Sequence, residues 1–231
     1  MKTAGIIGGI APESTVEYYR ELIAAYRERR TDGSYPSIVI NSIDLQKMLG
    51  FIAANELVAL ADYLSGEVEK LVHAGADCAL LASNTPHIVF DEIRRRSPIP
   101  MVSIVESACD ESRQLGLKKL GLLGTRFTMQ GRAYPDVFSK AGIELVTPLE
   151  EERHYVHDKY MNELVRVILL PETREGLLSL VSRMQQRDGI QGLILGGTEL
   201  PLILREPSHA GIPLLNTTKI HVRAMVAQLG W

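Results

Sequence analysis

Residues 75–85 read Gly-Ala-Asp-Cys-Ala-Leu-Leu-Ala-Ser-Asn-Thr, and residues 189–199 read Gly-Ile-Gln-Gly-Leu-Ile-Leu-Gly-Gly-Thr-Glu. Each stretch starts with a glycine, continues as a short apolar run and ends in small or polar residues. Such a run is typical of a buried parallel strand, and its ending predicts a turn. Aligned on their first glycines, the two stretches pair Ser83-Asn84-Thr85 with Gly197-Thr198-Glu199. The chain therefore contains a weak internal repeat.

The repeat extends to a second pair of apolar runs, since Gly5-Ile6-Ile7-Gly8 matches Gly121-Leu122-Leu123-Gly124. Between these runs lie longer stretches with helical spacing of apolar residues. Strands that alternate with helices predict an α/β protein with buried, mostly parallel sheets. We expect two pseudo-symmetric lobes, 1–104 plus 213–231 and 105–212, with helices around each sheet and a cleft between the lobes.

Three predicted helical features can be compared directly with a structure. Thr15–Arg29 spaces Val16, Tyr19, Ile23 and Tyr26 for one buried helix face, and Ser14 to Glu17 fits a capping box at the helix start. Thr85 before Pro86 fits a helix cap. A further helix is predicted at 161–169.

Composition narrows the class of partner. The 231 residues are 45% hydrophobic and 23% charged, with a formal net charge of -3. This balance indicates a folded globular chain, and it disfavours nucleic acid as the main partner because phosphate binding needs a basic surface. No apolar run reaches the roughly 18 residues of a membrane span. Cys78 and Cys109 form no C-x-x-C pair, so both are predicted to be structural, in a reduced cytoplasmic protein.

Four turns follow predicted strands at the edge where open α/β sheets bind ligands: 8–14, 83–85, 124–128 and 196–199. All are small and polar, and each precedes a predicted helix, whose free N–H groups attract anions. The turns predict a site for a small carboxylate, although each could equally be only a tight connection. The first turn does not fit G-x-G-x-x-G or a P-loop, so no nucleotide is expected. No metal-binding motif is present.

These turns resemble the motifs of the aspartate/glutamate racemase family, in the same order along the whole chain. Gly8–Thr15 is similar to the family's G-G-x-x-P-x-x-T, and Ser83–His87 to its C-N-T-x-H. Gly124-Thr125 is similar to its G-T turn and Gly196–Glu199 to its G-C-T-E. Asn216–His221 resembles its C-terminal signature.

The resemblance implies two α/β lobes that often form a homodimer and act without pyridoxal phosphate or metal. In the family, two cysteines, one in each lobe, flank the α-carbon of a small acidic amino acid. One thiolate removes the α-proton, and the other thiol returns a proton on the opposite face. Here Ser83 and Gly197 stand at the two cysteine positions. A serine hydroxyl is a much poorer base than a thiol, and glycine has no side chain.

Three hypotheses remain open at this stage. The first is racemisation of an aspartate- or glutamate-like amino acid by other proton-transfer groups. The second is a related decarboxylation or elimination on a small dicarboxylate. The third is binding of a small carboxylate without catalysis.

The residues expected in the site fall into three groups. The predicted catalytic positions are Ser83, Gly197, Glu199 and His87. The predicted substrate-binding residues are Gly9, Ser14, Asp44, Asn84, Thr85, Thr125 and Thr198. A second polar cluster contains His154, Tyr155 and His157. Structural roles stay open for His87 in packing, for Glu199 at a helix start and for Asp44 as a helix cap. No cofactor is expected.

Overall fold

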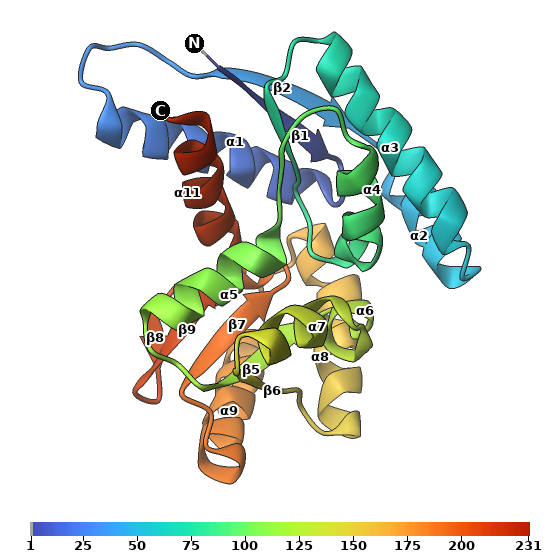
Figure 1. Ribbon diagram of the computed structural model, residues 1–231. Helices are drawn as coiled ribbons and strands as arrows, with labels where there is room; N and C mark the ends of the chain where they lie inside the picture. Colours follow the sequence, from blue (N-terminus) through green and yellow to red (C-terminus); the bar gives the residue numbers. More distant parts are fainter. Residues whose placement is uncertain (1) are drawn as a thin grey trace. The chain divides into compact units, whose positions relative to one another are not determined.

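The computed structural model describes residues 2–231, and the chain divides into two compact units. One unit runs to Ile104 and includes His221–Trp231; the other is Val105–Ile220. Each unit is built on one sheet, with strand order β2-β1-β3-β4 in the first and β6-β5-β7-β9-β8 in the second. Figure 1 colours the helices and strands in their order along the chain and labels most of them.

The first unit has four parallel strands, connected by helices. Its elements are β1 (Thr3–Gly8), α1 (Pro12–Arg29), β2 (Ser37–Ser42), α2 (Leu45–Ala53), α3 (Leu57–His73), β3 (Cys78–Leu81), the 3-10 helix η1 (Thr85–Val89), α4 (Phe90–Arg96) and β4 (Met101–Val102). One core cluster joins β1 and β3 to α1 and to the end of the chain, where the rings of Tyr26 and Trp231 meet edge to face at 5.3 Å.

The second unit has four parallel strands, and the short β8 is antiparallel to β9. Its elements are α5 (Ile104–Gln114), β5 (Lys119–Gly124), α6 (Arg126–Gln130), α7 (Ala133–Lys140), β6 (Glu144–Val146), α8 (Glu150–Asn162), η2 (Leu164–Arg166), α9 (Pro171–Asp188), β7 (Gly192–Gly196), α10 (Leu200–Ile203), β8 (Ser208–His209) and β9 (Ile212–Asn216). The last helix, α11 (Thr217–Leu229), begins in this unit and continues into the first from His221. Its core packs α8 and α9 against β7 and β9.

The two sheets repeat the same winding. In sequence order the strands of the first sheet lie 2-1-3-4, and β6-β5-β7-β9 is that order again. The register agrees as well, because Ile7 pairs with Leu81 and the equivalent Leu123 pairs with Leu195. The predicted fold class, two mostly parallel α/β lobes related by a repeat, is confirmed.

The end of the chain is divided differently from the predicted boundaries. The sequence predicts residues 213–231 in the first lobe, whereas β9 pairs with β7 in the second sheet. The second unit therefore extends to Ile220, and the first regains the chain only at His221.

The predicted start of the first helix is wrong, and of its predicted buried face only Tyr26 is fully buried. Helix α1 begins at Pro12, so Ser14 lies inside its first turn and cannot form the capping box. Its buried positions include Tyr18 and Leu22, whereas Val16 and Tyr19 are 43% and 45% exposed. The helix is rotated from the predicted face because Ser14 and Thr15 are themselves buried, in contact with the loop after β1.

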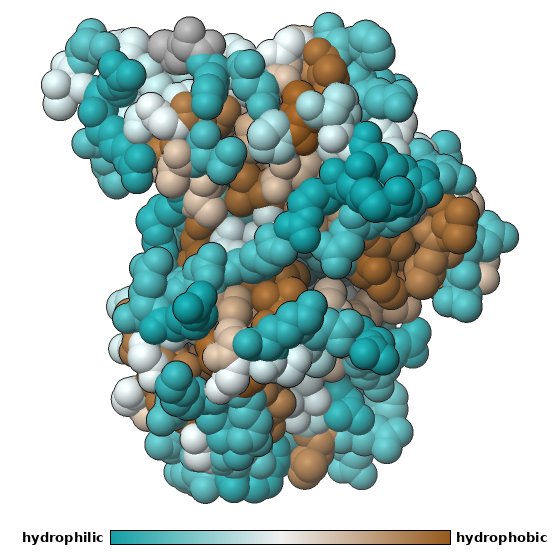
Figure 2. Space-filling view, viewed as in Figure 1, coloured by the Kyte–Doolittle hydropathy of each residue, from teal (hydrophilic) through white to brown (hydrophobic). Residues whose placement is uncertain are grey.

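The face of the surface in Figure 2 is largely hydrophilic, with smaller hydrophobic patches. Among residues 2–231, none of the helices has a stretch of the length and apolar character needed to traverse a lipid bilayer.

Candidate functional site

The order of the strands places a potential binding point in each unit. In open α/β sheets, ligands bind beyond the carboxyl ends of the strands where the winding reverses. The reversal lies between β1 and β3 in the first unit and between β5 and β7 in the second. Most of the residues that the sequence predicted lie in the loops at these points or in the first turn of the helix that follows: Gly9, Ser14, Ser83, Asn84, Thr85, Thr125, Gly197, Thr198 and Glu199.

The loop after β1 is held close to the backbone of the first unit. Gly9 has a φ of +82°, and a Cβ on this residue would lie 2.2 Å from the carbonyl oxygen of Ile43. Its N–H donates to Thr15 Oγ1 at 2.8 Å. Ser14 Oγ donates to the carbonyl of Ala11 at 2.7 Å and lies 3.3 Å from that of Ala82. The loops after β1 and β3 are thus connected by Ser14.

Ser83 and His87 are buried together after β3, with exposed fractions of 7% and 5%. His87 Nδ1 lies 2.9 Å from the carbonyl oxygen of Ser83, and its Nε2 accepts the N–H of Ile104 at 3.2 Å. The neutral tautomer with the proton on Nδ1 satisfies both contacts. Burial, with a smaller effect of His221, lowers the pKa of His87 to about 3. These contacts match the structural alternative for His87, since proton transfer would have to break one of them.

His221, from the C-terminal signature, is a second buried neutral histidine. Its Nδ1 lies 2.8 Å from the hydroxyl of Tyr18, and its Nε2 lies 2.9 Å from the carbonyl oxygen of Val102. Burial lowers the pKa of His221 to about 4, and the contact with the Val102 carbonyl raises it by a smaller amount. The ring therefore connects the last helix to α1 and to the end of β4.

Three predicted substrate-binding residues of the first unit lie at helix starts. Asp44 is exposed and accepts the N–H of Gln46 at 2.8 Å, which is the capping alternative. Thr85 is the first residue of η1, and the cap is Asn84, so the predicted cap is displaced by one residue. Asn84 is 5% exposed.

In the second unit, the turn after β5 caps a helix as well. Thr125 Oγ1 accepts the N–H of Thr128 at 3.3 Å and lies 3.2 Å from that residue's hydroxyl. The next N–H, that of Arg126, donates to His157 Nδ1 at 3.2 Å. Burial and the Arg126 charge lower the pKa of His157.

The turn after β7 lies against Tyr160 of α8, a residue that the sequence did not point to. A Cβ on Gly197 would lie 2.3 Å from Cε2 and 2.8 Å from the hydroxyl oxygen of Tyr160, in α8. The Tyr160 ring therefore fills the place of a side chain at residue 197. Its hydroxyl donates to Glu199 Oε2, which also accepts the Thr198 hydroxyl at 3.0 Å. Tyr160, Thr198 and Glu199 are at most 5% exposed.

The end of β9 borders the same turn. Asn216 pairs with Leu195 at the end of β7, and the Thr217 hydroxyl donates to the Leu195 carbonyl at 2.7 Å. Thr218 is 2% exposed, and its hydroxyl has no hydrogen-bond partner in the described part of the chain. A buried hydroxyl without a protein partner is costly, so a bound water or ligand is expected there.

The second polar cluster separates in the structure, although its three residues share α8. His154 is exposed, His157 contacts the start of α6, and the Tyr155 hydroxyl lies against Gly176 of α9.

The two cysteines are buried. Burial raises the pKa of Cys78 to about 11 and also raises that of Cys109.

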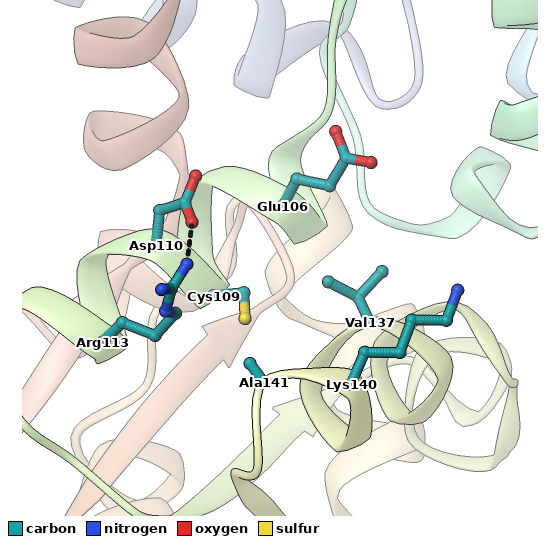
Figure 3. Close-up of a pocket in the computed structure, with 7 residues that line it drawn as sticks. All are labelled: Glu106, Cys109, Asp110, Arg113, Val137, Lys140 and Ala141. Atoms are coloured by element: carbon teal, nitrogen blue, oxygen red, sulfur yellow. Dashed lines mark ion pairs between the residues drawn. The ribbon is translucent and has the colours of Figure 1, made fainter.

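A separate cavity of about 580 Å³ lies between α5 and α7. Figure 3 shows the residues that line it, Cys109 among them. It is lined by Glu106, Cys109, Asp110, Arg113, Val137, Lys140 and Ala141. None of the sequence-predicted site residues lines this cavity. Across residues 2–231, we find no group of three or more His, Cys, Asp or Glu side chains that could hold a metal ion.

Two parallel α/β units of matching strand order, each with a small polar turn at its switch point, have the architecture of the two-lobed amino-acid racemases. The sequence profile of the Asp/Glu/hydantoin racemase family matches residues 7–225, and the chain belongs to this family.

Individual relatives agree with this assignment. The chain is similar to an aspartate racemase homologue, PH1733, from Pyrococcus horikoshii OT3, with 33% identity, a TM-score of 0.86 and full coverage of both chains. A candidate Asp/Glu racemase from Yersinia pestis matches with 30% identity, a TM-score of 0.89 and full coverage of both. The broad specificity amino-acid racemase RacX of Bacillus subtilis is 28% identical over 174 residues, 72% of this chain and 71% of RacX.

Proposed function

We propose that this protein removes and returns the α-proton of a small acidic amino acid, with its own side chains as the only proton-transfer groups. The matched turns after β3 and β7 carry the proposal, because small polar residues lie at the switch point of each unit. Family membership supports the reaction class. The name of PH1733 favours aspartate as the first substrate to test, and that of RacX favours a wider panel.

Roles for the predicted residues follow from their positions. Asn84, Thr85, Thr125 and Thr198 would bind the carboxylates, together with Thr218, whose buried hydroxyl needs a partner. Gly9 and Ser14 would shape the loop after β1. Ser83 would contact the substrate. The family resemblance further suggests a cytoplasmic homodimer that needs no pyridoxal phosphate.

One observation favours a second candidate, a reaction in which the proton is exchanged on one face only. In the first unit Ser83 has replaced the cysteine, and both ring nitrogens of the neighbouring His87 have backbone contacts. The second unit has Tyr160 and Glu199 at the equivalent place. A protein with a proton-transfer group on only one side of the α-carbon would exchange the α-proton, or decarboxylate the substrate, faster than it inverts the α-carbon.

Proton NMR in heavy water separates these functions. The purified protein is incubated with each enantiomer of aspartate, glutamate and a panel of neutral amino acids, and chiral chromatography measures inversion. Equal rates of α-proton loss and inversion support the racemase, and α-proton loss without inversion supports one-sided chemistry. Absence of exchange throughout the panel contradicts the proposal, and ligand-induced stabilisation in that case would indicate a carboxylate-binding protein.

A further inference from the structure

Gly197, at the position where the family resemblance places a cysteine, faces an aromatic ring from α8. Because Gly197 has no side chain, the space beside its Cα is open, and the Tyr160 ring fills it. The Tyr160 hydroxyl oxygen lies 2.8 Å from the position that a Cβ of residue 197 would take. A side chain at 197 would start from this point, at the carboxyl end of β7. The Tyr160 hydroxyl oxygen thus lies 2.8 Å from the point at which a side chain of residue 197 would begin.

The hydroxyl is also connected to a proton acceptor. Glu199 Oε2 accepts hydrogen bonds from Tyr160 and from Thr198, and all three side chains are buried. Tyrosine and carboxylate groups are both used as general acids and bases, provided that a hydrogen bond connects them to the proton being moved. Tyr160 itself need not ionise if its own proton passes to the Glu199 carboxylate as it accepts another.

We propose that Tyr160 is the catalytic acid and base of the second unit and that Glu199 is its relay partner. This assignment depends on the proposed function, since it names the groups that carry out its proton transfer. Tyr160 would contact the substrate, and Glu199 would act through Tyr160.

The step balances without another reactant. The Cα–H bond of the substrate breaks, its electron pair stays on the carbon as a carboxylate-stabilised carbanion, and the proton moves to the Tyr160 oxygen. The original Tyr160 proton moves at the same time to Glu199 Oε2. The protein ends with a neutral phenol and a neutral carboxylic acid, and the reverse transfer returns a proton to the carbon.

The environment of Tyr160 agrees with a relay rather than a free phenolate. Burial holds the pKa of Tyr160 well above its usual range, and the Glu199 charge raises it further. A tyrosine in this environment does not ionise near neutral pH, so it can accept a proton only while it releases its own. The Glu199 carboxylate is the group positioned to receive it.

The test measures exchange of the α-proton in heavy water at several substrate concentrations. Tyr160→Phe keeps the ring and removes the hydroxyl, and Glu199→Gln keeps the shape and removes the acceptor. We expect each to lower kcat about 100-fold or more, with KM changed less than about threefold, because general acid–base groups contribute about 10²–10⁴ in rate. Tyr134→Phe is the matched control, since Tyr134 is a buried tyrosine of the same unit, on α7; its kcat should not change. Urea unfolding verifies that each variant is folded.

The outcomes separate the two proposals. Exchange in the wild-type protein that survives Tyr160→Phe within about threefold overturns the assignment of Tyr160 and leaves the proposed function standing. If Glu199→Gln raises KM and leaves kcat unchanged, Glu199 positions the substrate and the relay is overturned. If the wild-type protein exchanges no member of the panel, the proposed function and the proton pair both fail.

Discussion

Tyr160 occupies the space of a side chain at Gly197: a Cβ there would lie 2.3 Å from Cε2 of the ring. Real Cβ atoms essentially never make contacts this short, so the Tyr160 ring in this position requires a residue without a side chain at 197. The two residues lie 37 positions apart in the sequence, and the ring comes from α8.

This relationship predicts the stability of variants at the two positions. Gly197→Cys should lower the free energy of unfolding by about 1–3 kcal/mol through overpacking, and Tyr160→Ala should lower it by about 3–5 kcal/mol through a cavity. The double variant should lose about 1–3 kcal/mol less than the sum, because each change relieves the other. Urea unfolding measures all three, and additive losses would show that the two residues do not share the space.

The same pairing determines how thiol chemistry can be restored. Ser83→Cys with Gly197→Cys places both family cysteines back, but the ring of Tyr160 still fills the second place. We expect thiol-dependent α-proton exchange only when Tyr160→Ala is added, with sensitivity to an alkylating reagent as the measurement. Alkylation-sensitive exchange in the variant with both cysteines and intact Tyr160 would contradict this expectation.

The repeat made much of the fold predictable. The glycine-led runs at 75–85 and 189–199 align in the sequence as their strands align in the sheets, with Leu81 and Leu195 at equivalent register positions. Tyr160 was missed because residues 150–159 contain many charges and lack an apolar stripe, so the predicted helix was 161–169 instead of Glu150–Asn162. Its contact with Gly197 spans two elements, and no local pattern records such a contact.

The start of α1 illustrates a different failure. Ser14 followed by Glu17 is the pattern of a capping box, but Ser14 Oγ donates to the carbonyl of Ala11 inside the first turn. Local pairing rules assume that the polar side chain is available to the helix end. Here burial of Ser14 against the loop after β3 decides its partner. The signal for an earlier helix start was Pro12, since proline is favoured at the first position of a helix.

Gly9 should tolerate no side chain. A positive φ costs an L-residue about 1–2 kcal/mol, and the new Cβ would lie 2.2 Å from the Ile43 carbonyl oxygen. We expect Gly9→Ala to lower the free energy of unfolding by more than about 2 kcal/mol. Gly50→Ala, in α2 with nothing within 4 Å of its Cβ, is the control and should raise it by about 0.5–1 kcal/mol. Equal effects in urea unfolding would contradict the role assigned to Gly9.

The two buried histidines predict a loss of stability in mild acid. The pKa of His87 is lowered to about 3 and that of His221 to about 4, whereas in the unfolded chain each lies near 6.5. As the pH falls below about 6.5, the unfolded state binds protons that the folded state does not, so the free energy of unfolding decreases. The slope approaches about 1.4 kcal/mol per pH unit for each histidine.

His221→Gln isolates this effect from that of the carboxylates, which both proteins share. Urea unfolding between pH 7.5 and 5 should show a shallower decrease for the variant, by about one histidine's slope. Parallel curves for the two proteins would mean that His221 can be protonated in the folded state.

Neither natural cysteine should take part in catalysis. Cys78 is 2% exposed in the core of the first unit, and burial raises its pKa to about 11, so it can supply little thiolate at neutral pH. Cys109 lines the cavity between α5 and α7, so we expect a thiol reagent to modify it first and Cys78 only on unfolding. Cys109→Ala and Cys78→Ala should each retain α-proton exchange within about threefold of wild type. Loss of α-proton exchange in a folded cysteine variant would show that a cysteine thiol transfers the proton. Tyr160 would then only pack against Gly197.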